Sequence, residues 1–339
     1  MNPLESQHGP EDTRLSRRTF LQSATAASLT LALPGVAAAA VGSLAKPVRI
    51  GLIADLHHDV MHDGPERLNV FLERMATVKP DAIMQLGDFA YPSDANAELI
   101  ARFNAGHDRA LHVIGNHDTD AGCTKAQCIE RWGIPDRYYT TDIEGLKLIV
   151  LDGNDTGSPT YSGGYPSYIG PEQVKWLKEQ LATLDGPIIV ASHQPLAGTS
   201  TVDNAEEIQA ILGDASDKVI LAINGHTHID DVMRIKGVPY LHVNSASYQW
   251  VGGDHRHESY PAKIHEEHPW ISCTCPYRDS LFAMLEVEPE HLTIRVTGGE
   301  TAWVGESPAA LGVKVDDSLI HGEEIAPRIR NRQFLRVRT

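Results

Sequence analysis

The sequence predicts a layered α/β domain with mixed sheets, and two features of the chain carry this prediction. Short apolar runs alternate with amphipathic segments between residues 48 and 223, which is the pattern of strands and helices stacked in layers. Beyond residue 238 the expected strands 238–243, 280–287 and 291–297 follow one another without intervening helices. Part of the sheet structure is therefore expected to be antiparallel.

The individual elements follow from apolar spacing and from proline. Residues 48–54 form an apolar run that ends directly at Asp55, as a buried strand would. Residues 65–79 carry apolar side chains at helical spacing, with Pro65 suited to a first helical turn and Pro80 to a stop. The same criteria predict strands at 82–86, 110–114, 146–151, 187–191 and 218–223, and helices at 95–106 and 171–184.

Three parts are expected along the chain: an export signal at 1–40, one main domain at 41–310 and a C-terminal extension at 311–339. The twin-arginine element Ser16-Arg17-Arg18-Thr19-Phe20-Leu21 precedes an alanine-rich stretch at 24–40 that ends in small residues. This stretch is too short and too weakly apolar for a stable membrane span. We expect export by the bacterial twin-arginine (Tat) machinery to the periplasm or the cell exterior, with an uncleaved anchor as the alternative.

The composition indicates an acidic globular protein. Of its 339 residues 42% are hydrophobic and 22% charged, and the formal net charge is -16. Such a surface repels nucleic acid at long range, so no dedicated nucleic-acid binding is expected. Five arginines among residues 327–339 are expected to form a solvated tail, with docking onto the acidic body as the alternative. No sequence signal indicates an oligomeric state.

The four cysteines allow more than one interpretation. An oxidising compartment permits disulfides, so Cys123 and Cys128 could close a small loop or pair with Cys273 and Cys275. Zinc binding is a further alternative, although the spacings do not match paired CxxC ribbons.

Five short polar signatures, most of them directly after an expected strand, supply metal-ligand chemistry. Imidazole, carboxylate and amide oxygen together suit divalent ions such as Mn, Fe(II) and Zn. Two ions roughly 3.5–4 Å apart repel each other, so a carboxylate is needed between them. The signatures are Asp55-Leu56-His57, Gly87-Asp88, Gly115-Asn116-His117-Asp118, His193 and Gly225-His226-Thr227-His228.

This ordered series resembles the calcineurin-like metallophosphoesterase superfamily, and within it the class III cyclic nucleotide phosphodiesterases and related glycerophosphodiesterases. The resemblance spans residues 55–228 and implies a four-layer α/β/β/α sandwich and a catalytic role for the 41–310 domain. It also implies two divalent metal ions (Mn, Fe or Zn) that share Asp88. One would lie on Asp55, His57, Asp88 and His228, and the other on Asp88, Asn116, His193 and His226.

The expected activity is hydrolysis of small phosphoesters, namely phosphodiesters of small alcohols or nucleotides, by attack of a metal-bound hydroxide. The resemblance makes His117 a non-ligand histidine that stabilises phosphate oxygens or protonates the leaving group. Asp118 is expected to orient the His117 ring and to raise its pKa. A simple turn-stabilising pair of the two residues is the alternative.

Two alternatives to a phosphodiesterase remain open. Gly87-Asp88-Phe89-Ala90-Tyr91 also matches the spacing of purple acid phosphatases, in which the tyrosine is an iron ligand. Since His57 would fill that coordination position, Tyr91 is expected in the wall of the substrate pocket. The second alternative is a metal-binding protein without catalytic activity.

Residues 244–277 are expected to form a long loop that walls the substrate pocket, because they are rich in proline, glycine and histidine. Tyr248 and Trp250 in this segment are candidates for stacking against a base or capping an alcohol. A surface loop or an oligomer contact is the alternative.

Overall fold

The computed structural model of the protein describes residues 44–314 and 325–335. These residues fall within one compact unit, Val41–Thr339. The expected export signal at 1–40 lies outside the described residues. In the described part of the chain no helix is long and apolar enough to cross a membrane.

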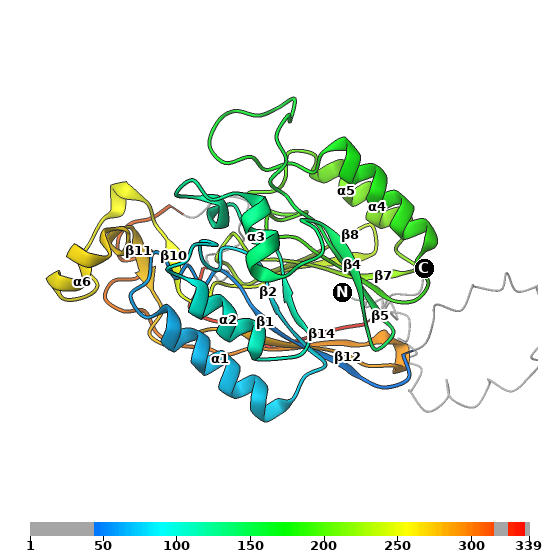
Figure 1. Ribbon diagram of the computed structural model, residues 1–339, viewed down its shortest axis with the longest axis horizontal. Helices are drawn as coiled ribbons and strands as arrows, with labels where there is room; N and C mark the ends of the chain where they lie inside the picture. The colour runs from blue at the N-terminus through cyan, green and yellow to red at the C-terminus, as the bar shows by residue number, and fades with distance from the viewer. Residues whose placement is uncertain (1–43, 315–324, 336–339) are drawn as a thin grey trace, which may run out of the picture. The chain divides into compact units, whose positions relative to one another are not determined.

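Two six-stranded mixed sheets form the centre of this unit (Figure 1). The first sheet has the order β14 (Arg332–Phe334), β13 (Ile294–Thr297), β12 (Ala283–Val287), β1 (Val48–Ile53), β2 (Ala82–Gln85) and β3 (Ala110–His112). The second has the order β4 (Tyr139–Ile143), β5 (Leu146–Val150), β6 (Ile188–Ala191), β7 (Val219–Asn224), β9 (Val238–His242) and β8 (Asp231–Ile235).

Both sheets combine parallel and antiparallel pairs, as expected. Strand β1 pairs parallel with β2 and antiparallel with β12, while β7 pairs parallel with both β6 and β9. The antiparallel pairs β8–β9 and β12–β13 come from the late part of the chain. The carboxyl ends of the parallel strands in each sheet therefore share one edge, where polar loops can converge.

The hydrophobic cores show the predicted four layers. Along β5, Leu148 and Val150 belong to a core shared with the first sheet, while Ile149 belongs to a separate core. This alternation is the period of two expected of a strand covered on both faces. The shared core continues to α1 (Gly64–Val78) and α2 (Ala97–Ala105), and the separate one contains α4 (Pro171–Thr183) and α5 (Ala205–Asp214). Figure 1 shows these helix pairs on opposite sides of the sheets, which confirms the α/β/β/α sandwich.

The sequence predicted α1, α2 and α4 within two residues at each end, but not α3 (Lys125–Trp132) or α5. Helix α3 begins with a capping box in which Thr124 accepts from the backbone N–H of Gln127 and the Gln127 side chain accepts from that of Thr124. It ends at Gly133 in the left-handed conformation. Both capping signals are present in the sequence. The helix was missed because, at eight residues, it is too short to show clear hydrophobic periodicity.

The arginine-rich C-terminal segment docks, so the prediction of a solvated tail is wrong for its described part. Strand β14 pairs with β13 at the edge of the first sheet. Arg330 Nε lies 2.8 Å from Asp230 Oδ2, and the Arg332 guanidinium contacts the other oxygen of this fully buried carboxylate. A buried carboxylate needs cationic donors of this kind. Asp230, a residue of the acidic main domain, is the carboxylate that these two arginines neutralise.

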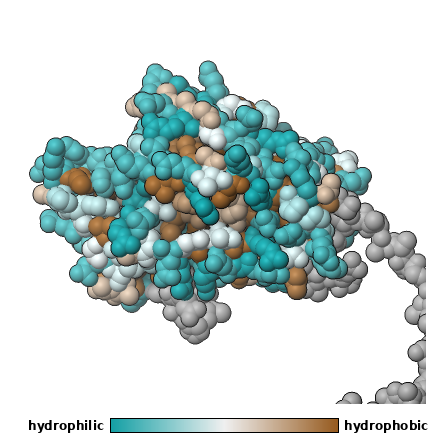
Figure 2. All heavy atoms as spheres, turned by 90° about the horizontal axis from the view of Figure 1, so that it is seen from below, coloured by the Kyte–Doolittle hydropathy of each residue, from teal (hydrophilic) through white to brown (hydrophobic). Residues whose placement is uncertain are grey.

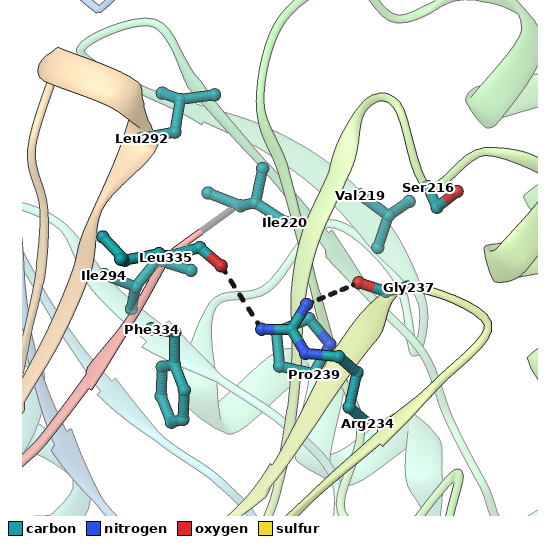
Figure 3. A pocket seen from close by; sticks show the side chains of 10 residues that line it. All are labelled: Ser216, Val219, Ile220, Arg234, Gly237, Pro239, Leu292, Ile294, Phe334 and Leu335. Atoms are coloured by element: carbon teal, nitrogen blue, oxygen red, sulfur yellow. Dashed lines mark hydrogen bonds between the residues drawn. The ribbon is translucent and has the colours of Figure 1, made fainter. Parts of the chain in front are cut away.

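The end of this segment lines a pocket together with β7–β9 and β13 (Figure 3). There the Arg234 guanidinium donates to the carbonyl oxygens of Gly237 at 2.9 Å and Leu335 at 3.4 Å. None of the predicted site residues lines this pocket.

Residues 244–277 are ordered rather than a long loop. They form the two-stranded ribbon β10 (Tyr248–Trp250) and β11 (Thr274–Pro276), with the short helix α6 (Ala262–Glu267) between them. A small core of Met61, Tyr248 and Ile271 holds the segment to the domain. The buried Arg67 on α1 also donates to the carbonyl oxygens of Ala246 and Tyr277. Viewed from below the orientation of Figure 1, the surface has small groups of apolar residues scattered among polar ones (Figure 2).

Candidate metal centre

The seven predicted metal ligands come together at the carboxyl ends of five parallel strands. Each of these strands ends two to four residues before the first ligand that follows it: β1, β2 and β3 of the first sheet, and β6 and β7 of the second. Six of the seven side chains are buried and His226 is partly exposed. The set is Asp55, His57, Asp88, Asn116, His193, His226 and His228.

One group of three consists of Asp55, His57 and His228. The Nε2 atoms of the two histidines are 3.1 Å apart, and Asp55 Oδ1 lies 3.3 Å from His228 Nε2 and 3.9 Å from His57 Nε2. Ligands at about 2.1 Å from one metal ion are separated by roughly 3.0–3.4 Å. These three side chains therefore can bind one divalent ion.

A second group consists of Asp88, His193 and His226. Asp88 Oδ2 lies 3.1 Å from His193 Nε2, which is in turn 3.2 Å from His226 Nδ1. Asn116 Oδ1 is 3.2 Å from the same His193 nitrogen, so its amide oxygen faces this group. Asp88 Oδ2 also lies 3.6 Å from His57 Nε2 of the first group. This carboxylate stands between the two groups, as a bridging ligand must.

The histidine tautomers fit a cation. His193 Nδ1 lies 2.8 Å from the Leu86 carbonyl oxygen, and His228 Nδ1 lies 2.8 Å from that of Tyr248. A carbonyl oxygen only accepts, so in each ring Nδ1 carries the hydrogen and Nε2 presents a lone pair. Both lone pairs converge on carboxylate and amide oxygens, which are themselves acceptors. Acceptors placed this close together repel one another unless a positive ion lies between them, and the chemistry of this set fits two divalent metals.

The ligands are held in an unfavourable backbone conformation. Non-glycine residues with positive φ are uncommon, cost roughly 1–3 kcal/mol each, and persist where the surrounding structure requires them. Five of the seven predicted ligands have φ between 47° and 69°: Asp55, His57, Asp88, His226 and His228.

The glycines of the signatures permit close approach to the carboxylates. A Cβ atom at Gly115 would lie 2.1 Å from Asp88 Oδ1, and one at Gly225 would lie 2.5 Å from Asp55 Oδ2. Neither position can accept a side chain without moving a ligand, which explains the glycine in both signatures.

Charges in the centre are strongly coupled. Burial favours the neutral form of Asp88, but His193 and His57 hold the pKa of this carboxyl well below its usual range. Burial also opposes a charge on His193, yet the Asp88 carboxylate raises the pKa of His193 to about 9. Burial lowers the pKa of His226 to about 3. In the metal-free protein, a proton on His193 thus supplies the positive charge beside Asp88 that a bound metal ion would otherwise supply.

His117 is positioned by Asp120, so the expected pairing with Asp118 is wrong. His117 Nδ1 lies 2.7 Å from Asp120 Oδ2, and the Tyr165 hydroxyl donates to Asp120 at 2.8 Å. The short helix η1 (His117–Thr119) explains the pairing, since residues three apart lie on the same side of a 3-10 turn. The spacing His-x-x-Asp was visible in the sequence, but the turn type was not. Tyr165 comes from the distant loop before α4, and no sequence signal pointed to it.

Asp118 instead holds the loops that carry the ligands. Its buried carboxylate accepts from the backbone N–H groups of Asp88 at 3.0 Å, Phe89 at 2.9 Å, Ala90 at 3.2 Å and Gly115 at 2.7 Å. Burial and the nearby Asp88 charge raise the pKa of Asp118 to about 7. It is a positioning residue for the backbone and does not contact the His117 ring.

The three predicted pocket residues have different surroundings. Tyr91 lines a pocket together with His57, Asp88 and His117. Burial raises the pKa of Tyr91 to about 12, so the phenol keeps its proton. Tyr248 is buried and stacks on the His57 ring with 5.0 Å between centroids, whereas Trp250 is 45% exposed.

All four cysteines are free thiols, so the disulfide alternatives do not hold in this structure. Cys128 is buried and lies against the Asp118 carbonyl oxygen. Cys273 directly precedes β11 and Cys275 lies within it, opposite Gln249 on β10. Among the described residues, no group of metal-binding side chains contains a cysteine, which also leaves the zinc alternative without support.

Comparison with known proteins agrees with this geometry. The family model described as calcineurin-like phosphoesterase matches residues 48–230. A cAMP/cGMP dual specificity phosphodiesterase of Mycobacterium tuberculosis is 31% identical over 202 residues, covering 55% of this chain and 61% of the relative. A probable cyclic nucleotide phosphodiesterase of Psychrobacter arcticus is 28% identical over 175 residues, covering 47% and 60%. The chain thus matches about three fifths of the length of these curated relatives.

Two solved structures have the same fold at low sequence identity. A dimetal phosphatase from Danio rerio superposes with a TM-score of 0.53 and 14% identity, covering 78% of this chain and 99% of that one. GAP50, described as the anchor in the inner membrane complex of Plasmodium, superposes with a TM-score of 0.51 and 16% identity, covering 77% and 86%. The family model covers more than half of the chain and contains all seven converging side chains, so the chain belongs to the calcineurin-like phosphoesterase family.

Proposed function

We propose that this protein hydrolyses phosphodiesters of small alcohols or nucleotides at a dinuclear metal centre. The observation that carries the proposal is the pair of adjacent ligand groups, with Asp88 Oδ2 3.1 Å from His193 Nε2 on one side and 3.6 Å from His57 Nε2 on the other. Two metal ions bound by these adjacent groups would be suited to support an in-line displacement at phosphorus. The names of the two curated relatives support a phosphodiester substrate.

Two divalent ions, Mn, Fe or Zn, would supply Lewis acidity that neutralises phosphate charge and acidifies water. The first group and Asp88 would hold one ion, and Asp88, Asn116, His193 and His226 the other. His193 and His228 are fixed in orientation by their Nδ1 contacts to carbonyl oxygens. The protein therefore presents its ligands ready for binding, without side-chain rearrangement.

His117 would act on the oxygen atoms of the substrate. Its ring centroid lies 5.3 Å from that of His57, at the edge of the ligand cluster. Asp120 occupies Nδ1, so Nε2 is the atom left to donate a hydrogen bond or a proton to a phosphate or leaving-group oxygen. Tyr91, which lines the same pocket, would form part of the substrate wall.

The rival activities make different predictions for the purified protein loaded with Mn. A phosphodiesterase hydrolyses bis(p-nitrophenyl) phosphate in preference to p-nitrophenyl phosphate. A purple-acid-phosphatase-like monoesterase reverses this preference and shows tyrosinate-to-Fe(III) absorption in the iron form. A protein without catalytic activity binds two metal ions per chain but hydrolyses neither ester, and this outcome would reject the proposal.

We also infer that the protein is exported by the Tat machinery to the periplasm or the cell exterior, since Arg17 and Arg18 precede an alanine-rich stretch. The test is cell fractionation of the full chain and of the R17K/R18K double variant. Retention of the variant inside the cell, with export of the wild type, supports the inference. Equal distribution of both proteins overturns it.

A further inference from the structure

Two tryptophans stand exposed side by side near the metal centre. Trp250 is 45% exposed and Trp270 is 55% exposed, and their ring centroids are 6.5 Å apart. Large aromatic side chains are expensive to leave in water, and a paired exposure of this kind commonly marks a binding surface.

The pair is connected to the centre by a continuous line of rings. Tyr248 stacks on His57, with 5.0 Å between centroids and 29° between planes. On β10, Tyr248 and Trp250 are alternate residues and so share a face of the strand, with their rings 6.4 Å apart. The Tyr248 ring therefore connects His57 in the ligand cluster to the exposed Trp250.

The support beneath the two tryptophans is rigid. Strand β10 pairs with β11, and the backbone N–H groups of Val251 and Gly252 donate to the Cys273 carbonyl oxygen at 2.9 and 3.1 Å. Trp270 lies in the short helix η3 (Pro269–Cys273), which leads directly into β11. Both rings are thus carried by one hydrogen-bonded ribbon and need little ordering when a ligand binds.

A cation adjoins the pair. The Arg256 guanidinium carbon lies 5.7 Å from the Trp270 ring centroid. Within the described ranges Arg256 has no ion-pair partner, although the whole chain carries a formal charge of -16. An unpaired guanidinium beside exposed aromatic faces suits a ligand that is planar and anionic.

We propose that Trp250 and Trp270 form a stacking subsite for a nucleobase, so that the substrates of the metal centre are nucleotide phosphodiesters. This rests on the proposed phosphodiesterase function and narrows its substrate class. The base stacks on the exposed indoles, its phosphate lies at the ligand cluster, and Arg256 attracts the anionic nucleotide to this side of the pocket. Tyr248 is buried against His57, so it lines the base of the subsite and does not offer a face on which a nucleobase could stack.

The test separates base recognition from catalysis. KM and kcat are measured for an adenosine cyclic phosphodiester and for an aliphatic glycerophosphodiester, with wild type, W250A, W270A and the conservative W250F. Stacking on an aromatic side chain is worth roughly a factor of 5 to 150 per base. We expect KM for the adenosine ester to rise about tenfold or more in both alanine variants, with kcat and both constants of the aliphatic ester unchanged. W250F should restore most of the loss.

W176A is the matched control, because Trp176 lies on α4 and packs against Tyr138 at a tilted angle, away from the β10–β11 ribbon. A second readout does not need turnover: quenching of tryptophan fluorescence by adenosine 5′-monophosphate, with ribose 5-phosphate as the ligand that lacks a base. Quenching that W250A and W270A weaken, but W176A does not, supports the subsite.

Several results would overturn the proposal. One is a KM for the adenosine ester that is unchanged in both alanine variants. Another is a rise in KM that is equal for the adenosine ester and the aliphatic ester. Tryptophan-dependent binding to phosphatidylglycerol vesicles without quenching by the nucleotide would assign the pair to a lipid surface. A tryptophan-dependent dimer in sedimentation velocity without such quenching would assign it to a second copy. If the wild type hydrolyses neither ester, the proposed function fails, and the fluorescence titration still decides the subsite.

Discussion

The replacement of Asp120 by asparagine is the sharpest test of the site geometry. This change keeps the shape of the side chain but removes the charge that faces His117 Nδ1 at 2.7 Å. A hydrogen bond to a charged group is worth about 1.5–3 kcal/mol, and partial exposure reduces this to about 1–2 kcal/mol. At 1.4 kcal/mol per factor of ten, D120N should lose roughly 5- to 30-fold in kcat.

The loss should depend on the leaving group. An alkoxide needs a proton from His117 as it departs, whereas p-nitrophenolate leaves without one. We therefore expect the full effect on an alkyl or nucleoside diester and little effect on bis(p-nitrophenyl) phosphate. The assay is steady-state turnover of both esters, with metal content per chain measured in parallel to show that the centre is intact.

Asp118 provides the matched contrast. In D118N an amide NH2 group would face two backbone N–H donors that now share one carboxylate oxygen, for example those of Phe89 and Ala90. Unsatisfied buried donors cost about 1–3 kcal/mol each, so D118N should lower the free energy of unfolding by at least about 2 kcal/mol. The reasoning is refuted if D118N shows the leaving-group dependence and D120N does not.

Three further outcomes are expected. H193A should lose about one of two metal ions per chain, measured by elemental analysis, and most of its hydrolytic activity. The variant H291A, at an exposed surface histidine, should keep both its metal content and its activity. Full metal content in H193A would reject the ligand assignment. R332A leaves the buried Asp230 carboxylate with fewer donors, so urea unfolding should show a loss of roughly 2–4 kcal/mol, and an unchanged midpoint would contradict the docked tail. Burial lowers the pKa of His112 to about 3 from 6.5, so the folded state takes up its proton later than the unfolded state. The contribution of His112 to the free energy of unfolding is complete above pH 6.5 and falls as the pH drops toward 3. Between pH 6.5 and 5, the free energy of unfolding of the metal-free H112N variant should therefore fall by about 2 kcal/mol less than that of the wild type.

The predicted strands and ligand positions agree with the structure because both depend on local patterns. Apolar runs such as residues 48–54 and 187–191 are buried on both faces, and the polar residue after each run is placed by the strand itself. Parallel strands bring their carboxyl ends to one edge, so side chains 171 residues apart, such as His57 and His228, meet at 3.1 Å. The ordered signatures, through the family that they resemble, predicted that convergence.

The predictions that failed concern contacts whose partners are set by the fold. Asp118 is adjacent to His117 in sequence and Asp120 is three residues away, and the 3-10 turn decides that the more distant carboxylate faces the ring. The arginine-rich tail was taken as solvated because nothing in the chain marks Asp230 as buried and without a local cation. Residues 244–277 looked like a loop because their helical and strand segments are each too short to show periodicity.

The sequence by itself determined the family chemistry of this protein: the ligand types, their order and the layered architecture that gathers them. These follow from side-chain chemistry and from apolar periodicities of 2 and 3.6 residues, which act within a few neighbouring residues. The tertiary structure alone decided which carboxylate holds His117, where the C-terminal arginines dock, and that Trp250 and Trp270 stand together beside the centre. Each of those depends on distances between segments far apart in the chain, and such distances are set by packing rather than by local pattern.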